Sequence, residues 1–144
     1  MKKVVLLIAL ALGMANGFAD DAKQVSEKMA KDAIAQWNAV LHSGNIDALM
    51  HLYANNAVVL LPNGKAAKDK QAIRRFWKQL LDSNPSHFKL DLADVIYAKD
   101  DTVVSSVRWM NKEDGLEYSY DGVIYNVFKR QADGSWKAQA QRWN

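Results

Sequence analysis

The chain has 144 residues, with 19 Lys or Arg, 16 Asp or Glu and no cysteine. The lack of cysteine excludes disulfides, thiol nucleophiles and thiolate metal sites, and the length fits a single domain with its own hydrophobic core. Without its two N-terminal lysines the chain carries a net charge of +1, from 17 basic and 16 acidic residues, and no basic stripe typical of nucleic-acid binders is visible. No nucleic-acid partner is therefore expected.

The first 19 residues predict an export signal. A positively charged start is followed by a short apolar stretch and by the small-residue cleavage site Gly17-Phe18-Ala19. The apolar stretch is too short for a convincing membrane span. We expect cleavage after Ala19, which leaves a periplasmic or secreted domain over residues 20–144 that is not attached to a membrane; an uncleaved N-terminal anchor is the alternative.

The next third of the chain predicts helices around one short strand. Apolar residues at helical spacing predict a long amphipathic helix over 20–43 and a short helix over 45–53. The continuous apolar run over 58–61 predicts a strand that is buried on both sides. A third helix follows, which Asp69 caps and which ends before Pro85.

The remaining residues predict four antiparallel strands, over 87–97, 102–111, 116–130 and 135–143. The turns between them are rich in Asp and Gly: Ala98–Asp101, Lys112–Gly115 and Ala132–Gly134. Pairing each hairpin about its turn places Trp109 opposite Leu90 and Tyr118, and it places Phe128 opposite Ala138. Helices first and strands last predict an α+β domain with the helices packed on one face of the sheet.

The predicted pairing sorts the hairpin residues into two faces, because side chains alternate along a strand. The inner face collects apolar and aromatic residues: Phe88, Leu90, Leu92, Ile96, Val103, Val107, Trp109, Tyr118, Tyr120, Ile124, Phe128 and Trp136. Its polar members are few: Asp94, Ser105, Asn126 and Arg142. A large apolar wall with a few polar groups is typical of a small-molecule pocket, so we expect a small apolar or aromatic ligand there.

Two pairs of residues are candidates for catalysis. Asp94 and Arg142 share the predicted inner face, where the carboxylate suits a general base and the guanidinium suits binding of a carboxylate or a ring; the alternative is that both are solvated at strand ends. Asp47 and His51 share one face of a short helix, where a surface ion pair is the alternative. No third ligand for a metal is evident beside them, and we expect neither a metal nor a cofactor.

Three stretches carry a resemblance to a known family: Trp37 with Ser43-Gly44-Asn45, residues 52–58, and residues 126–137. Together with the order of predicted elements, they are similar to the SnoaL-like group of the nuclear transport factor 2-like superfamily. The resemblance implies a cone-shaped α+β fold, with N-terminal helices packed on the concave face of a curved, mainly antiparallel sheet. It implies no single activity, because the superfamily includes isomerases, dehydratases, cyclases, hydrolases and non-catalytic binding modules.

The resemblance argues against one activity. Ketosteroid isomerases of this fold use a carboxylate base at the end of the first strand and an oxyanion hole that includes a tyrosine. The alignment puts Leu61 at the position of the base and Trp37 at the position of the tyrosine. Neither side chain moves a proton from carbon, so ketosteroid isomerase activity is not expected.

The sequence thus predicts an exported small-molecule-binding domain of SnoaL-like type. The alternatives are an enzyme of the isomerase, cyclase, dehydratase or hydrolase type that uses the pairs named above, and a non-catalytic interaction module. The expected ligand-binding residues are Trp37, Tyr53, Trp77, Ser105, Trp109, Tyr120, Asn126 and Arg142. Aromatic residues on the convex sheet face also predict a homodimer through that face. The resemblance implies the same, because the family commonly dimerises through its convex face.

Overall fold

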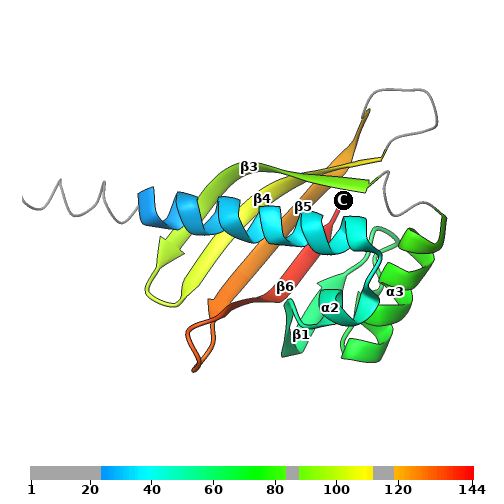
Figure 1. The fold of residues 1–144 in the computed structure, drawn as a ribbon, viewed down its shortest axis with the longest axis horizontal. Helices are drawn as coiled ribbons and strands as arrows, with labels where there is room; N and C mark the ends of the chain where they lie inside the picture. The colour runs from blue at the N-terminus through cyan, green and yellow to red at the C-terminus, as the bar shows by residue number, and fades with distance from the viewer. Residues whose placement is uncertain (1–23, 84–87, 112–118) are drawn as a thin grey trace, which may run out of the picture.

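The computed structural model describes residues 24–83, 88–111 and 119–144; the expected export signal, Tyr118 and the middle hairpin turn lie outside this part of the chain. An N-terminal helix over residues 24–43 comes first (Figure 1). The other elements are α2 (Ile46–Met50), β1 (Tyr53–Leu60), β2 (Ala66–Ala67), α3 (Lys70–Ser83), β3 (Phe88–Lys99), β4 (Thr102–Asn111), β5 (Ser119–Arg130) and β6 (Trp136–Trp143). No helix in the described ranges combines the length and the apolar character that crossing a membrane requires.

The strands form one six-stranded sheet in the order β2-β1-β6-β5-β4-β3. The pair β1–β6 is parallel and the other pairs are antiparallel, so the sheet is mixed and mainly antiparallel. The N-terminal helix lies along one face of this sheet, and α2 and α3 lie at one end (Figure 1). The predicted α+β class and the helix-on-sheet arrangement are confirmed.

Caps set the starts of the two shorter helices. The Asn45 side chain accepts a hydrogen bond from the amide of Ala48, and Asp69 Oδ1 accepts one from the amide of Ala72 at 2.8 Å. The second helix ends earlier than predicted, and β1 begins earlier, at Tyr53. The turn-prone pair at residues 55–56 stays inside β1, where the register against β6 shifts.

The first hairpin confirms the predicted pairing of Leu90 with Trp109 but changes farther along β3. Register shifts occur just before Asp94 and again beyond it, so Asp94 lies opposite Ser106. A one-residue shift moves every following side chain to the other face. The predicted inward positions of Asp94 and Ile96 are therefore wrong: Asp94 is exposed, and Ile96 is 54% exposed.

In the second hairpin, the residue pairing between β4 and β5 differs from the prediction. Trp109 lies opposite Gly122 rather than Tyr118. The offset is an even number of residues, so the inner face of β5 is preserved along most of its length. Ser105 and Asn126 accordingly lie opposite each other, and both are buried, as predicted.

The third hairpin confirms the pairing of Phe128 with Ala138, and then a register shift changes which residues of β6 face inward. Gln141 lies opposite Asn126 and is buried. Arg142, one residue later, is exposed. The predicted inward position of Arg142 is wrong, because this register shift turns Gln141 inward and Arg142 outward.

The N-terminal helix is attached to β3, which is the edge strand opposite β2. The side-chain amide of Asn38 donates to the carbonyl of Leu90 and accepts from its backbone N–H, both at 2.8 Å. The ring of His42 lies 3.1 Å from the carbonyl oxygen of Phe88. These contacts fix the helix across the concave face, where its apolar side buries Ile34, Trp37 and Leu41.

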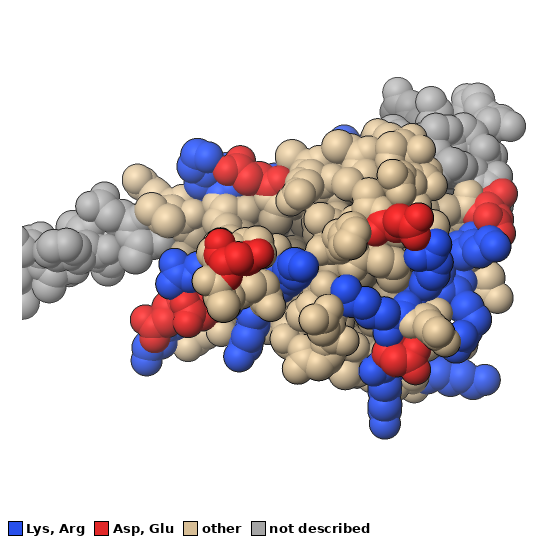
Figure 2. Space-filling model, turned by 60° about the horizontal axis from the view of Figure 1, so that its bottom comes forward, with Lys and Arg blue, Asp and Glu red and all other residues tan. Residues whose placement is uncertain are grey.

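Charge is unevenly distributed over the surface. In Figure 2, lysine and arginine side chains gather on the side of the molecule that carries α3, whereas acidic and basic side chains are mixed elsewhere on that face. The segment 65–82 contains six basic and two acidic residues, a net charge of +4, against +3 for the whole chain.

Candidate functional site

The interior of the cone is filled by aromatic rings. Ring centroids in this cluster lie 5.1 to 6.1 Å apart, mostly in tilted or edge-to-face arrangements. We call it the aromatic core; its members are Trp37, Tyr53, Phe76, Trp77, Phe88, Trp109 and Trp143. Trp37 and Trp77 come from the helices and close the space that the sheet encloses. Both were expected to be ligand-binding residues; in the structure they are buried and fill the cone.

A hydrogen-bonded chain runs through the aromatic core. Trp77 Nε1 donates to the Tyr53 hydroxyl at 2.7 Å, and that hydroxyl donates to Gln141 Oε1 at 2.5 Å. Trp143 Nε1 donates to the same Gln141 oxygen at 3.4 Å. Burial raises the pKa of Tyr53 well above its ordinary value, against the smaller lowering effect of the two hydrogen bonds. Tyr53 is therefore a neutral phenol whose bonds hold helix α3 and strand β6 together.

Ser105 and Asn126 are two further polar residues on the inner face, and they lie opposite each other. They are 0% and 3% exposed, on neighbouring strands. Neither Ser105 Oγ nor Asn126 Oδ1 has a hydrogen-bond partner in the described part of the chain. Buried polar atoms are normally paired, so these two atoms need an explanation beyond the fold itself.

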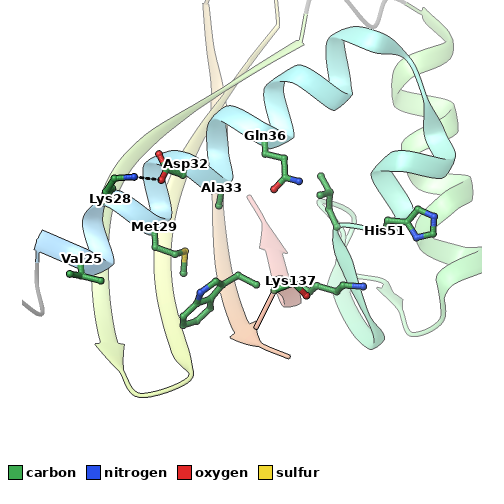
Figure 3. A pocket seen from close by; sticks show the side chains of 11 residues that line it. Val25, Lys28, Met29, Asp32, Ala33, Gln36, His51 and Lys137 are labelled. Carbon is green, nitrogen blue, oxygen red and sulfur yellow. Dashed lines mark hydrogen bonds and ion pairs between the residues drawn. The ribbon is translucent and has the colours of Figure 1, made fainter. Parts of the chain in front are cut away.

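An open hollow lies between the start of the N-terminal helix and the β5–β6 hairpin (Figure 3); we call it the helix hollow. Its volume is about 530 Å³. Apolar side chains from both sides line it: Val25, Met29, Ala33, Leu52 and Trp136. The polar lining consists of Lys28, Asp32, Gln36, His51, Ser135 and Lys137.

The polar side chains around the helix hollow include one ion pair and two groups outside any ion pair with described residues. Lys28 is paired with Asp32 at 2.7 Å, within one turn of the helix. Lys137 extends across the hollow toward the side where His51 lies (Figure 3). Neither Lys137 nor His51 is in an ion pair with a residue that the structure describes. His51 and Lys137 thus lie on the side of the hollow away from the start of the helix (Figure 3).

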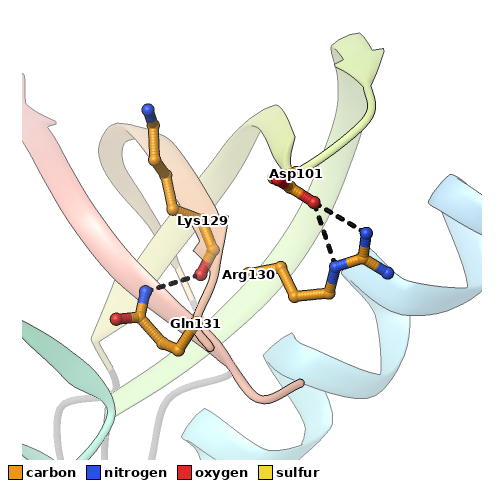
Figure 4. Close-up of polar contacts among 4 residues, drawn as sticks. All are labelled: Asp101, Lys129, Arg130 and Gln131. Carbon is orange, nitrogen blue, oxygen red and sulfur yellow. Dashed lines mark hydrogen bonds and ion pairs between the residues drawn. The ribbon is translucent and has the colours of Figure 1, made fainter. Parts of the chain in front are cut away.

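A neighbouring hollow of about 480 Å³ shares Val25, Met29 and Trp136 with the helix hollow. Arg130 borders it and is held by Asp101, whose Oδ1 accepts from Nη2 at 2.7 Å and from Nε at 3.1 Å (Figure 4). The guanidinium carbon lies 5.9 Å from the ring centre of Trp136. Arg130 therefore supports the indole that separates the two hollows.

The structure does not bring the predicted catalytic pairs together. Asp94 and Arg142 are exposed, on strands three places apart in the sheet. Asp47 is in an ion pair with Arg74 at 2.6 Å, and His51 instead lines the helix hollow. In the described ranges, no three His, Asp or Glu side chains gather in a way that could hold a metal ion.

The remaining predicted residues fall in three places. Trp109 is half-buried at the edge of the aromatic core and donates its Nε1 hydrogen to the carbonyl of Asn144 at 3.2 Å. Tyr120 pairs with Met110 along the backbone, but its side chain is outside the described part. Leu61 is half-buried at the end of β1, with no acidic group in its place.

Sequence reasoning missed Gln141 as an inner-face residue and Met29 and Trp136 as walls of one hollow. A signal for Gln141 was present: alternation back from the C-terminal Trp143 places both side chains inward. For the helix hollow no sequence signal exists, because Met29 and Trp136 meet only through the position of the helix over the sheet.

Solved structures share this fold at low sequence identity. An NTF2-like protein of unknown function from Pseudomonas putida KT2440 has a TM-score of 0.69 at 16% identity, over 85% of this chain and 88% of that chain. An NTF2-like protein with a cystatin-like fold from Novosphingobium aromaticivorans has a TM-score of 0.64 at 18% identity, over 90% and 87%. An NTF2-like protein of unknown function from Shewanella oneidensis MR-1 has a TM-score of 0.64 at 14% identity, over 79% and 94%.

Sequence comparison places the chain in a family without indicating an activity. No curated protein matches it. The model of the SnoaL-like domain matches residues 34–139, which is more than half of the chain, and the chain therefore belongs to the SnoaL-like domain family.

Proposed function

We propose that this domain binds a small apolar or aromatic molecule in the helix hollow. The observation that carries the proposal is the hollow itself, with its volume of about 530 Å³ and its floor of Met29, Leu52 and Trp136. Ligand sites are typically concave, mostly apolar and roughly 300–1,000 Å³ in volume, with a few polar groups that orient the ligand. Gln36, His51 and Lys137 are such polar groups in the lining of the helix hollow.

The helix hollow is favoured over the centre of the cone as the ligand's position, because aromatic rings fill that centre. The rings of Trp37, Tyr53 and Trp77 contact one another at the centre of the cone, with Trp37 and Tyr53 centroids 5.1 Å apart. A ligand at the centre would have to displace rings that are almost completely buried. The helix hollow offers apolar surface on the same side of the sheet without such displacement.

The proposal is tested with the neutral fluorescent probe N-phenyl-1-naphthylamine. Ala33 lines the hollow, so Ala33→Phe fills it without removing a contact. Ala35 is exposed on the same helix, and Ala35→Phe is the matched control. We expect saturable fluorescence enhancement with the wild type and with Ala35→Phe, and at least a tenfold weaker affinity with Ala33→Phe. Equal binding by all three proteins, or no saturable binding by the wild type, contradicts the proposal.

Native mass spectrometry of the protein purified from its own source adds a direct test for a retained ligand. A co-purified molecule that Ala33→Phe no longer retains supports a container role. A molecule that this variant still retains at the same occupancy places the ligand outside the helix hollow.

We also propose that the domain forms a homodimer through the outer face of the sheet. Tyr97 and Tyr125 are 50% and 42% exposed there, and large exposed aromatics on a sheet face are typical of an interface. Sedimentation equilibrium of the wild type and of Tyr125→Asp tests this. A dimer that the substitution converts to a monomer is expected, and a monomeric wild type at high micromolar concentration contradicts it.

A further inference from the structure

A second hollow, of about 720 Å³, lies between α3 and the hairpin that joins β1 to β2. It shares no lining residue with the helix hollow. Its apolar floor includes Leu61 and Phe76, and its polar groups are Asn63, Lys65, Arg75 and Gln79. None of its lining residues is acidic. We call it the hairpin hollow.

The cations of the hairpin hollow have no carboxylate partner among residues 24–83, 88–111 and 119–144. Arg74, next to Arg75 on α3, is in an ion pair with Asp47 at 2.6 Å. By contrast, no described carboxylate lies within ion-pair distance of Arg75 or Lys65. They belong to the segment 65–82, whose net charge is +4. Unbalanced positive charge in a concave site raises the local concentration of anions.

The hairpin holds one of these cations in place. The amide of Leu61 donates to the carbonyl of Lys65 at 2.8 Å, and the amide of Lys65 donates to Asn63 Oδ1 at 3.0 Å. Gly64 closes the turn with a φ of +79°, a conformation that favours glycine. The Asn63 oxygen therefore faces the amide of Lys65, and the side-chain NH2 group of Asn63 offers two donors, which suit an anionic ligand.

We propose that the hairpin hollow binds an organic anion, a carboxylate or sulfonate carried on a flat apolar body. The apolar body lies on Leu61 and Phe76, and the anionic group pairs with Arg75 and Lys65. An inorganic anion would make no use of the apolar floor, and a neutral apolar molecule would leave the unbalanced charge unused. The hollow is at the edge strand of the sheet; it borders the aromatic core through Phe76 and shares no lining residue with the helix hollow.

The test uses 2-naphthoate and its uncharged analogue 2-naphthamide, with binding followed by amide chemical shifts of the full domain. We expect 2-naphthoate to shift the amides of residues 61–66 and 72–79 in a saturable manner. An exposed charge pair contributes up to about 1 kcal/mol, so we expect 2-naphthamide to bind about fivefold more weakly. Raising the salt concentration weakens binding of 2-naphthoate and leaves that of 2-naphthamide unchanged.

Two variants with the same charge change separate the site from the general charge of α3. Arg75→Gln removes a cation of the hollow, and Lys78→Gln removes an exposed cation that lines a different hollow on the same helix. We expect Arg75→Gln to weaken 2-naphthoate binding about fivefold and Lys78→Gln to change it by less than about twofold. Both residues are at the surface, and the amide spectrum itself reports whether each variant is folded.

Three outcomes overturn the inference: no saturable shifts near the hairpin, equal effects of the two variants, or equal affinity for the acid and the amide. Shifts confined to the surroundings of Met29 and Trp136 place the ligand in the helix hollow and also overturn it. Failure of the helix-hollow proposal is seen separately, with Ala33→Phe, because that residue does not line the hairpin hollow.

Discussion

Removal of the Tyr53 hydroxyl is the sharpest test of the interior described above. Tyr53→Phe deletes the oxygen that accepts from Trp77 Nε1 at 2.7 Å and donates to Gln141 Oε1. Two buried hydrogen bonds are lost at about 1 kcal/mol each, so we expect the free energy of unfolding to fall by about 2 kcal/mol. In a domain of this size that corresponds to a melting temperature lower by about 7 °C.

The measurement is urea and thermal unfolding followed by tryptophan fluorescence and circular dichroism. Tyr97→Phe is the control, because Tyr97 is 50% exposed and loses the same atom; we expect a change within about 0.5 kcal/mol. If Tyr53→Phe also falls within that range, the hydrogen-bonded chain does not hold α3 to β6 and the reasoning is refuted.

The same residue predicts a specific response to alkaline pH. Burial raises the pKa of Tyr53 above its ordinary value of 10.0, so the folded protein keeps a proton that the unfolded chain releases. Its contribution to stability is fully present below pH 10 and is lost as the pH rises above 10, by about 1.4 kcal/mol per pH unit. Tyr53→Phe lacks this loss. Wild type and variant with parallel stability curves between pH 9 and 11 would contradict the buried, protonated phenol.

Four further substitutions test the inner face and its register, each by urea unfolding. Ser105→Ala removes an unpartnered buried hydroxyl, so we expect a neutral effect or stabilisation by up to about 1 kcal/mol; a clear loss would show that the hydroxyl has a partner such as water or a ligand. Gly122→Ala adds a methyl group that overlaps the Trp109 indole, and we expect a loss of about 2 kcal/mol. Gln141→Leu should cost about 2 kcal/mol and Arg142→Leu less than about 0.5 kcal/mol, whereas the unshifted register would reverse that order.

The sequence was sufficient to predict the faces of the sheet wherever alternation runs unbroken. Ser105, Asn126 and Phe128 lie inward as expected, because the offset in their hairpin is even and preserves the face. Asp94 and Arg142 were misplaced for one shared reason. Each follows a register shift that inserts one residue, and the side chains directly after that shift turn to the other face. Such shifts depend on how the strands bend around the helix. The alternation of apolar and polar residues along a strand does not predict this bending.

Helical spacing likewise predicted the helices that carry Trp37 and Trp77, but not whether these rings leave a cavity. That depends on the combined volume of rings from the N-terminal helix, α3 and strands β1, β3, β4 and β6. The two hollows were not predictable for a related reason. Their walls come from different elements, such as Met29 with Trp136 and the β1–β2 hairpin with α3, which only the assembled fold places together.

The amide of Asn38 has a consequence for solubility. An edge strand presents unpaired backbone groups that can recruit a strand from another molecule and start aggregation. The Asn38 side chain occupies both groups of Leu90, as a neighbouring strand would, and the His42 ring contacts the carbonyl of Phe88. The helix that covers the concave face therefore also shields the start of β3 from intermolecular strand pairing.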